Sequence, residues 1–294
     1  MHVKNNQNRL AWVLLALISL IWGSSFILIK KGLVLFSADE VGTLRIFMAS
    51  LVLLPFGIRA MSRVPRKKLP YIFMVGFVGS YIPSMLFALA QTRVDSAITG
   101  VINSFTPIFV SLFGALFFQL QMSGRSVAGV VIGLLGCIFI LLGGANFQIS
   151  GINYYGFLIL AATLMYGINA NIIKSFLPEV KALDITALSF TLIFPICGSY
   201  LFWGTGFSDK ISTDPQFLKA FGYIATLGVL GTALAMFIFN NLVKIASPVF
   251  AASCTYIIPV IAIGWGLIDG ETLNIYQYLG IVIVLTGVYL ANRK

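Results

Sequence analysis

The chain has 294 residues, of which 59% are hydrophobic and only 10% are charged, and its mean hydropathy is +0.98. A soluble domain carries about 25% charged residues, so this composition excludes a soluble protein. Apolar runs of about 20 residues also exclude a membrane β-barrel, whose strands are about 10 residues long and alternate in polarity. We therefore predict an all-α polytopic membrane protein.

Ten membrane-spanning helices are predicted, because ten apolar segments are bounded by charged residues, proline or glycine. In chain order they cover residues 10–30, 41–58, 69–91, 96–118, 126–145, 154–175, 184–203, 217–241, 247–268 and 274–291. The first is expected to be retained, since it is long for a signal peptide and has no clear cleavage site. Short polar segments, residues 1–9 and 292–294, precede and follow the helices.

Most of the 19 Lys and Arg residues fall on one side of these helices, and the group from Arg59 to Lys68 contributes most to this asymmetry. Basic residues in short loops are retained in the cytoplasm, so both termini are predicted to be cytoplasmic. The net charge of +10 comes without a basic patch that contains aromatic residues. It therefore indicates a lipid bilayer as partner, and no nucleic acid.

The second half of the chain repeats features of the first half. Near the start of each half the offset is 144, which matches Trp22-Gly23 with Tyr166-Gly167 and Lys30 with Lys174. Further along it is 152, which matches Gly79 with Gly231, Ser96 with Pro248 and Pro107 with Pro259. In the last helix of each half it is 151, which matches Gly129 with Gly280 and Gly136 with Gly287. We predict two five-helix repeats, residues 10–145 and 154–291. An odd number of helices per repeat inverts the second one in the membrane, as in transporters that work by alternating access around a central cavity.

Polar and aromatic side chains at helical spacing indicate which faces line such a cavity, because these groups are costly against lipid. The candidates for substrate binding are Trp22, Arg45, Tyr81, Gln91, Asn103, Tyr166, Asn169 and Tyr256. The aromatic members favour a small-molecule substrate with an apolar part. A structural alternative stays open, since polar side chains also join neighbouring helices and the aromatic rings can be ordinary core residues.

Arg45 is the only charged residue well inside a predicted helix. One interpretation is structural: it reaches the lipid headgroups or pairs with Asp39 or Glu40. The other is that it supplies a positive charge for an anionic or zwitterionic substrate.

Pro107 and Pro259 occupy equivalent places in the two repeats. Proline removes a backbone donor and clashes with the carbonyl four residues earlier, here that of Asn103 or Thr255. We expect a kink or hinge at each proline, with a fixed bend as the alternative.

The motifs of ATP-driven pumps, metallohydrolases and serine hydrolases are missing from the sequence. All nine acidic residues lie at helix ends or in loops, and the only histidine is His2, so a buried proton relay is disfavoured. Cys137, Cys197 and Cys254 show no metal or disulfide spacing. We predict no enzyme, cofactor or metal site. The alternatives to a transporter are an intramembrane enzyme and a non-transporting scaffold or receptor.

Small residues in the last helix of each repeat allow close backbone approach. Gly129-x-x-x-Gly133 is followed by Gly136, and the tenth helix contains Gly280 and Gly287. These helices are expected to pack on each other or on a second copy of the chain, so a homodimer is possible.

Several short motifs follow one another in a fixed order. They are Trp22-Gly23-Ser24-Ser25-Phe26 with Lys30, Leu44-Arg45, Ala88-Leu89 leading to Ser96-Ala97 and the Pro107 helix, and Glu271 nine residues before Gly280 with Gly287. Together they resemble the EamA family of the drug/metabolite transporter superfamily. The resemblance implies ten helices in two inverted repeats, a central cavity, and export or exchange of small metabolites such as amino acids, which we expect at the cytoplasmic (inner) membrane. The chain departs from the family pattern in having Gln119 or Gln121 near the usual Glu, and its second repeat has Tyr166 where the first has Trp22.

Overall fold

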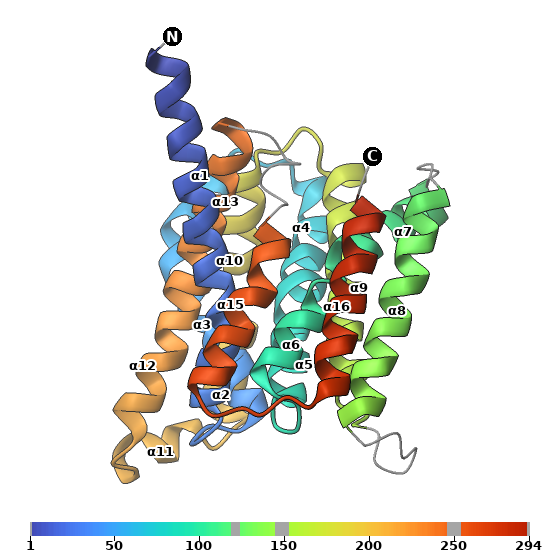
Figure 1. Cartoon of the computed structure of the whole chain (residues 1–294). Helices are drawn as coiled ribbons and strands as arrows, with labels where there is room; N and C mark the ends of the chain where they lie inside the picture. Colours follow the sequence, from blue (N-terminus) through green and yellow to red (C-terminus); the bar gives the residue numbers. More distant parts are fainter. Residues whose placement is uncertain (1, 119–123, 145–152, 246–253, 293–294) are drawn as a thin grey trace.

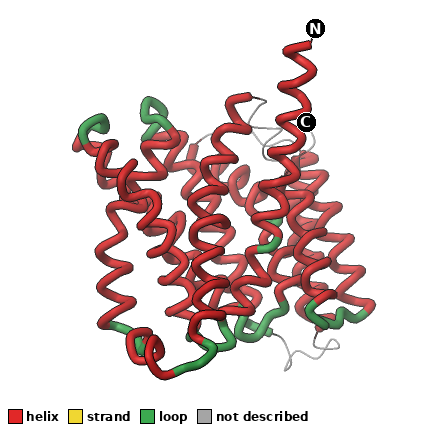
Figure 2. Tube along the Cα trace, turned by 90° about the vertical axis from the view of Figure 1, so that its left-hand side faces the viewer, coloured by secondary structure: helices red, strands yellow, loops and turns green. Residues whose placement is uncertain are grey.

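The computed structural model describes residues 2–118, 124–144, 153–245 and 254–292. Within these ranges all regular structure is helical and no strand occurs, so the all-α prediction is confirmed (Figures 1 and 2). Seven of the described helices are long and apolar enough to cross a membrane by length and composition. Three shorter apolar helices, at 127–142, 254–268 and 275–290, accompany them. The chain is a multi-pass membrane protein.

The elements follow the predicted order with some interruptions. They are α1 (His2–Gly23), α2 (Ser25–Gly32), α3 (Ala38–Met61), η1 (Arg66–Lys68), α4 (Leu69–Gly76), η2 (Phe77–Tyr81), α5 (Ile82–Ala90), α6 (Ser96–Asn103), α7 (Thr106–Phe118), α8 (Gly124–Gly144), α9 (Gly156–Phe176), α10 (Ala182–Trp203), α11 (Phe207–Thr213), α12 (Phe217–Gly228), η4 (Val229–Leu234), α13 (Ala235–Ile245), α15 (Cys254–Ile268) and α16 (Ile275–Asn292). The short helix α11 lies in a segment that the sequence pattern left as a loop. The free ends of α1 and α16 lie at the same end of the bundle (Figure 1).

Two predicted helices contain a π-helical turn, η2 and η4, that the hydrophobic pattern does not indicate. Each turn includes one of the glycines matched in the sequence, Gly79 or Gly231. A Cβ atom on Gly79 would lie 2.2 Å from Cγ of Asn169, so the absence of a side chain lets α9 approach the backbone of η2. A π turn of five or six residues changes the periodicity too briefly to be visible in a sequence of apolar residues.

The helix predicted for residues 96–118 is in fact two helices, α6 and α7, separated by a turn at Ser104 and Phe105. Pro107 lies in the first turn of α7, where its missing N–H is not needed. The Thr106 hydroxyl donates to the Asn103 carbonyl at 2.9 Å, so this carbonyl already has a partner. The expected kink is thus a complete break before the proline, and its action as a hinge stays a prediction.

Pro259 lies buried inside α15. The beginning of the helix predicted at 247–268 lies outside the described residues, as do Gln119 and Gln121. Residues 254–258 precede Pro259 within α15, so the break found directly before Pro107 has no counterpart directly before Pro259.

The last helices of the two repeats, α8 and α16, pack closely along their glycines. A Cβ on Gly136 would lie 2.7 Å from the Val284 nitrogen, and a Cβ on Gly287 would lie 2.4 Å from the Gly133 nitrogen. These two contacts are equivalent, because residues 133 and 284, like 136 and 287, are 151 positions apart. The glycines meet within one chain, so they are not free to mediate the homodimer that the sequence left possible.

Other contacts between the halves also occur in equivalent pairs, and again a glycine approaches the other helix. A Cβ on Gly76 would lie 2.6 Å from the Ser189 carbonyl oxygen, and a Cβ on Gly228 would lie 2.6 Å from the Arg45 carbonyl oxygen. Similarly, Gly23 faces the Cβ of Ile261 at 2.6 Å and Gly167 faces the Cβ of Phe109 at 2.8 Å. The members of each pair are related by the offsets of 144 and 152 found in the sequence.

Ion pairs at the helix ends repeat in the same way. Lys210 Nζ lies 2.5 Å from Glu40 Oε2, and Arg63 Nη2 lies 2.5 Å from Asp184 Oδ1. Glu40 and Asp184 are 144 positions apart, and each lies in the first turn of its helix, α3 or α10. A carboxylate in this position also interacts favourably with the helix dipole.

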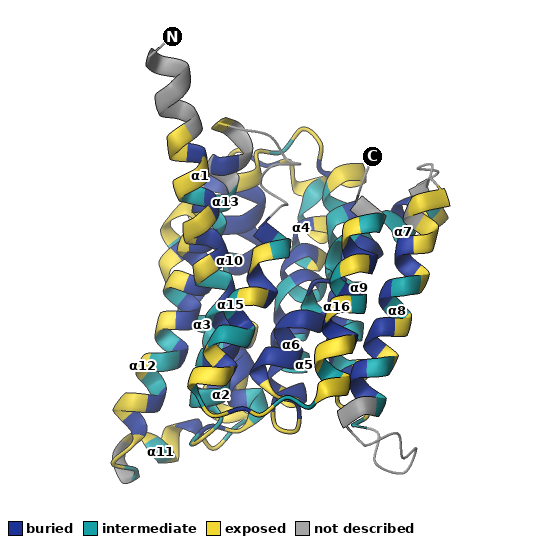
Figure 3. Ribbon diagram, viewed as in Figure 1, coloured by how far each residue is buried: buried dark blue, intermediate teal, exposed yellow. Residues whose placement is uncertain are grey.

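Many residues on the outer faces of the helices are exposed (Figure 3), and large hydrophobic side chains are frequent among them. Large hydrophobic side chains such as Trp12, Phe117, Leu135 and Val282 are 58–68% exposed. A soluble monomer rarely exposes apolar patches on this scale, whereas a surface that contacts lipid requires them.

Candidate functional site

Two of the predicted substrate-binding residues meet the π-helical turn η4. The Trp22 indole, at the end of α1, donates to the Gly231 carbonyl at 3.2 Å. The Arg45 Nε, on α3, donates to the Thr232 hydroxyl at 3.1 Å. Two helices that are distant in sequence thus bring an aromatic ring and a guanidinium to one π-helical turn. A third candidate, Tyr166 on α9, packs against the same hydrophobic core as Trp22.

Aromatic rings extend this group on its apolar side. The ring centroids of Trp22 and Phe239 are 5.3 Å apart, and those of Tyr166 and Phe87 are 6.0 Å apart. Trp22, Tyr166, Phe239 and Tyr256 all pack, partly buried, against the same hydrophobic core. The site therefore combines one cation with an apolar wall.

Arg45 has no carboxylate partner in the described part of the chain, which removes the predicted pairing with Asp39 or Glu40. Glu40 instead pairs with Lys210 and accepts from the Ser37 backbone N–H, and Asp39 accepts from the Tyr200 hydroxyl at 3.3 Å. The Arg45 side chain turns toward η4, where its only hydrogen bond within the described residues is the one from Nε. Its terminal Nη1 and Nη2 atoms have no hydrogen-bond partner among the described residues.

Other candidate residues also carry polar atoms without a hydrogen bond from the described residues. The Asn169 Oδ1 and both polar side-chain atoms of Gln91 are enclosed and unpaired. The Asn103 amide is half-buried, and neither it nor the Tyr166 hydroxyl has a protein partner in the described ranges. A buried polar group without a partner costs about 1–3 kcal/mol, so these atoms are suited to contact water or a ligand.

Tyr81 packs in a second core between α3 and α10 that also contains Ala233 of η4, and its hydroxyl lies 3.5 Å from that of Thr43. Gln91 follows the last residue of α5, and no contact from the described residues connects it to η4.

The hydroxyl groups in the predicted polar stripes are mostly used by backbone. Ser19, Thr99 and Thr106 each donate to a carbonyl of their own segment, three or four residues earlier. Ser84 donates to the Gly42 carbonyl of another helix at 2.9 Å. The structural interpretation of these hydroxyls is therefore the better one.

Thr232 and Phe239 belong to the site but were not among the sequence candidates. The matched glycines, Gly79 and Gly231, were the only signal in this region of the chain, and they gave no indication of a π-helical turn. The hydroxyl beside Gly231 faces Arg45 only because helix packing brings α3 against η4.

A second polar cluster surrounds Glu271, at the end of the bundle opposite the two termini. Its Oε1 accepts from Lys30 Nζ at 2.8 Å and from the Ser96 hydroxyl and backbone N–H at 2.7 and 2.9 Å. Its Oε2 accepts from the Ala97 N–H at 3.0 Å, at the N-terminus of α6. Asp269 pairs with Lys30, at 2.8 Å, and with Lys31. Burial acts to raise the pKa of Glu271, but the hydrogen bonds from Lys30, Ala97 and Ser96 outweigh it and hold the pKa below its usual value.

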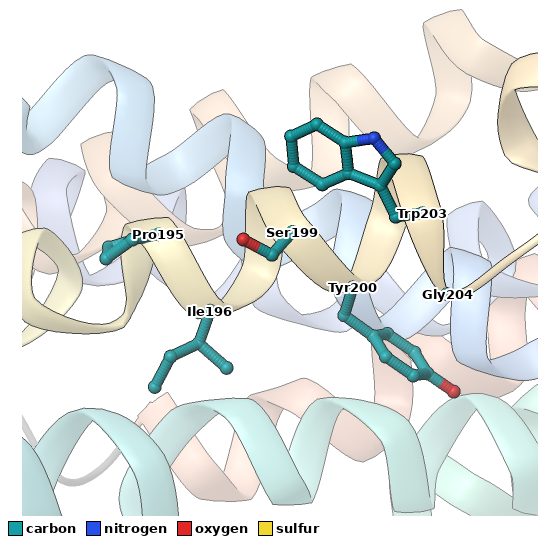
Figure 4. A pocket seen from close by; sticks show the side chains of 6 residues that line it. All are labelled: Pro195, Ile196, Ser199, Tyr200, Trp203 and Gly204. Atoms are coloured by element: carbon teal, nitrogen blue, oxygen red, sulfur yellow. The ribbon is translucent and has the colours of Figure 1, made fainter.

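Two surface grooves occur on the described part of the chain, and one of them borders η4 without including Gly231 or Thr232. One, of about 610 Å³, is lined by Pro195, Ile196, Ser199, Tyr200, Trp203 and Gly204, and Ile196 and Tyr200 project to one side of α10 (Figure 4). Another, of about 400 Å³, lies between α3, α10 and the η4–α13 segment and is lined almost entirely by apolar side chains. Apolar surface grooves between membrane helices are suited to lipid chains rather than to a polar metabolite.

The asparagines at positions 169 and 171 of α9 offer a test of the unpaired amide. Asn171 Nδ2 donates to the Val110 and Gly167 carbonyls at 3.0 and 2.9 Å, whereas Asn169 Oδ1 has no partner. We expect Asn171→Ala to lower the free energy of unfolding by about 1–2 kcal/mol more than Asn169→Ala, since it alone loses two hydrogen bonds. Thermal unfolding of the two purified variants measures this difference. Equal destabilisation would show that Asn169 is an ordinary structural residue.

Comparison with known proteins gives a consistent result over the whole chain. The EamA-like transporter family matches residues 10–142 and again residues 153–293. An uncharacterized transporter of Archaeoglobus fulgidus is 26% identical over 96% of this chain and 99% of its own length. An uncharacterized inner membrane transporter of Escherichia coli K12 is 24% identical, covering 93% and 87% of the two chains. A probable amino-acid metabolite efflux pump of the same organism is 22% identical, covering 95% and 93%.

These relatives are named as transporters and not as enzymes, and the resemblance inferred from the sequence motifs is confirmed. The family match occurs twice and spans nearly the entire chain, and the helices it covers surround the η4 group. The chain belongs to the EamA-like transporter family.

Proposed function

We propose that this transporter moves small polar or amphipathic metabolites, such as amino acids or related compounds, by export or exchange. Substrate binds in a central cavity between two inverted five-helix repeats and is exposed to either side of the membrane by alternating access. The observation that carries the proposal is the set of equivalent contacts between the two halves of the chain.

Equivalent contacts support inverted repeats because a two-fold operation must exchange them. When the two halves are exchanged, the contact of Gly76 with Ser189 becomes the contact of Gly228 with Arg45. In the same operation the two glycine contacts between α8 and α16 replace each other. The carboxylates of the Arg63–Asp184 and Lys210–Glu40 pairs are also related by the offset of 144, although their basic partners are not matched in the sequence. Such an axis, lying in the membrane plane, makes opening toward one side equivalent to closing toward the other. Ten spanning helices follow if the three shorter apolar helices cross the membrane with the seven longer ones.

The η4 group is suited to be the central site for the same reason. Trp22 and Tyr166 are equivalent residues of the two repeats, 144 positions apart, and both pack on one core beside Arg45. Two residues related by a two-fold axis come together only near that axis. Asn103, Asn169 and Tyr256 are proposed to complete the lining.

The direction of transport and the membrane are proposed from the distribution of basic residues and from the names of relatives. The basic residues from Arg59 to Lys68 support cytoplasmic termini. The names of two relatives, an inner membrane transporter and a probable amino-acid metabolite efflux pump, support export of amino-acid metabolites across the cytoplasmic membrane.

The proposal is tested by flux measurements on protein reconstituted in liposomes. A metabolite panel is first screened for thermal stabilisation of the purified protein, and the compounds that stabilise it are used as labelled substrates. We expect Asn103→Ala and Tyr256→Ala to reduce flux by about tenfold, as expected for the loss of one or two ligand contacts. Tyr278→Ala is the matched control, because Tyr278 is 41% exposed on the outer surface of α16.

Unchanged flux in both variants would remove these residues from the site. Single cysteines introduced on the Asn103 face test the mechanism itself, in a variant in which the three native cysteines are replaced. Labelling of these cysteines should change sides when substrate is added. Labelling that never changes sides under any condition would contradict alternating access and favour a scaffold or receptor.

A further inference from the structure

We infer that Arg45 binds the carboxylate of the transported compound, so that the substrate class is an amphipathic monocarboxylate or amino acid. The inference rests on the proposed function and goes beyond it by assigning the charge of the substrate and the group that binds it.

The first step is the isolation of this charge. Arg45 follows the first residue of α3 by seven positions, which places it about 10 Å into the helix at a rise of 1.5 Å per residue. An ionised side chain at such a depth is costly unless a counter-charge or water compensates it. Within the described residues no carboxylate is paired with it, since Asp39 and Glu40 have other partners.

The second step is the orientation of the guanidinium. Its Nε is held by the Thr232 hydroxyl, and the backbone at Arg45 is held against Gly228, where a Cβ would lie 2.6 Å from the Arg45 carbonyl oxygen. The two terminal nitrogens are left without a protein partner in the described ranges. Two parallel N–H groups match the two oxygens of a carboxylate, and this bidentate pairing is stronger than a neutral hydrogen bond.

The third step concerns the net charge of the substrate and the aromatic side chains near Arg45. Other cations near helix ends are already neutralised, Lys30 and Lys31 by Asp269 and Glu271, and Lys210 by Glu40. One free guanidinium suits a monoanion better than a phosphate dianion. The Trp22 ring, whose indole donates to Gly231 next to Thr232, and the Phe239 ring packed against it provide an apolar surface for the remainder of the substrate.

The experiment compares ligands that differ only in the carboxylate. 3-Phenylpropionate, L-phenylalanine, L-phenylalaninamide and 2-phenylethylamine are measured for binding by thermal shift and for counterflow in liposomes, with the corresponding leucine series in parallel. The proteins are wild type, Arg45→Gln, Arg45→Lys and Ser189→Ala. Ser189 is the control because it lies 144 positions from Arg45 and donates only within its own helix.

In the wild type, the carboxylates should bind and the amide and amine should not. Arg45→Gln should weaken carboxylate binding by about tenfold or more, Arg45→Lys should weaken it less, and Ser189→Ala should leave it unchanged. If 3-phenylpropionate binds as well as phenylalanine, the carboxylate alone is recognised; if only phenylalanine binds, the ligand is the amino acid. Either result supports the inference.

The inference is overturned if the amine or amide binds as well as the carboxylates, or if Arg45→Gln retains the preference of the wild type. A loss of folding does not imitate the expected result, because the thermal transition of each variant without ligand is recorded in the same measurement. If the wild type moves only uncharged or cationic compounds, the inference fails while the proposed function stands. If it moves none of the compounds identified in any screen, both fail.

Discussion

Replacing Glu271 by glutamine is expected to lower the free energy of unfolding by about 2–4 kcal/mol. The Glu271 side chain is only 2% exposed and accepts four hydrogen bonds, from Lys30, Ser96 and Ala97. Glutamine removes the charge that Lys30 needs as a partner and places an amide NH₂ group opposite backbone donors. Thermal and denaturant unfolding of the purified protein measure the loss.

Asp269→Asn is the matched control, because Asp269 contacts the same Lys30 but its side chain is 16% exposed. Solvent screens such a pair, so the loss should be smaller than for Glu271→Gln. The first substitution should also make single cysteines introduced near Ser96 more reactive toward added thiol reagents, because the contact between the α15–α16 loop and α6 is weakened. Equal stability of the two variants would contradict a special role for Glu271.

The same cluster determines an acid dependence of stability. Hydrogen bonds from Lys30 and Lys31 lower the pKa of Asp269, and the pKa of Glu271 is also lowered, against the effect of burial. A carboxyl group with a lowered pKa stabilises the fold above its unfolded value, near 4.5 for Glu271, and loses this contribution as the pH falls through the folded value. Asp95 acts in the opposite sense, since burial and the nearby Glu271 raise its pKa. Stability should therefore fall below about pH 4.5, and fall less in Glu271→Gln.

Replacing Gly287 by leucine is expected to prevent close packing of α8 and α16 and to destabilise the protein by about 3 kcal/mol or more. A side chain at this position would meet the Gly133 nitrogen at 2.4 Å and the Gly129 carbonyl oxygen at 2.8 Å. Both are backbone atoms, so they cannot move aside without shifting the whole helix. Fluorescence-detected size exclusion and thermal unfolding should show a lower yield and a lower transition temperature.

Gly264→Leu is the control for this change. Gly264 is also inside a membrane helix, α15, but a Cβ there would meet no atom within 4 Å. The variant should fold nearly as well as the wild type. If both variants are equally stable, the glycines of α8 and α16 do not determine the packing of these helices.

The candidate site was only partly predictable from the sequence. Trp22, Arg45 and Tyr166 could be named because a charge or a large polar aromatic is unexpected in a membrane helix. Thr232 could not be named, because an isolated threonine resembles the many residues, such as Ser19 and Thr99, whose hydroxyl donates to a carbonyl four residues earlier in the chain. The partner of Arg45 was equally open, since lipid headgroups, Asp39 or Glu40, and a substrate all fitted its position in the sequence.

The amino-acid sequence by itself determined that the chain is a bundle of membrane helices with two related halves. Length of apolar runs, the position of charges and the offsets of matched residues are local properties, and the bilayer requires each spanning segment to satisfy its backbone hydrogen bonds internally. Only the tertiary structure decided where the helices are interrupted, at η2, at η4 and before Thr106, and which polar atoms meet. These features depend on close approach between helices far apart in the chain, such as α9 against Gly79 and α3 against Gly228, and no single segment contains that information.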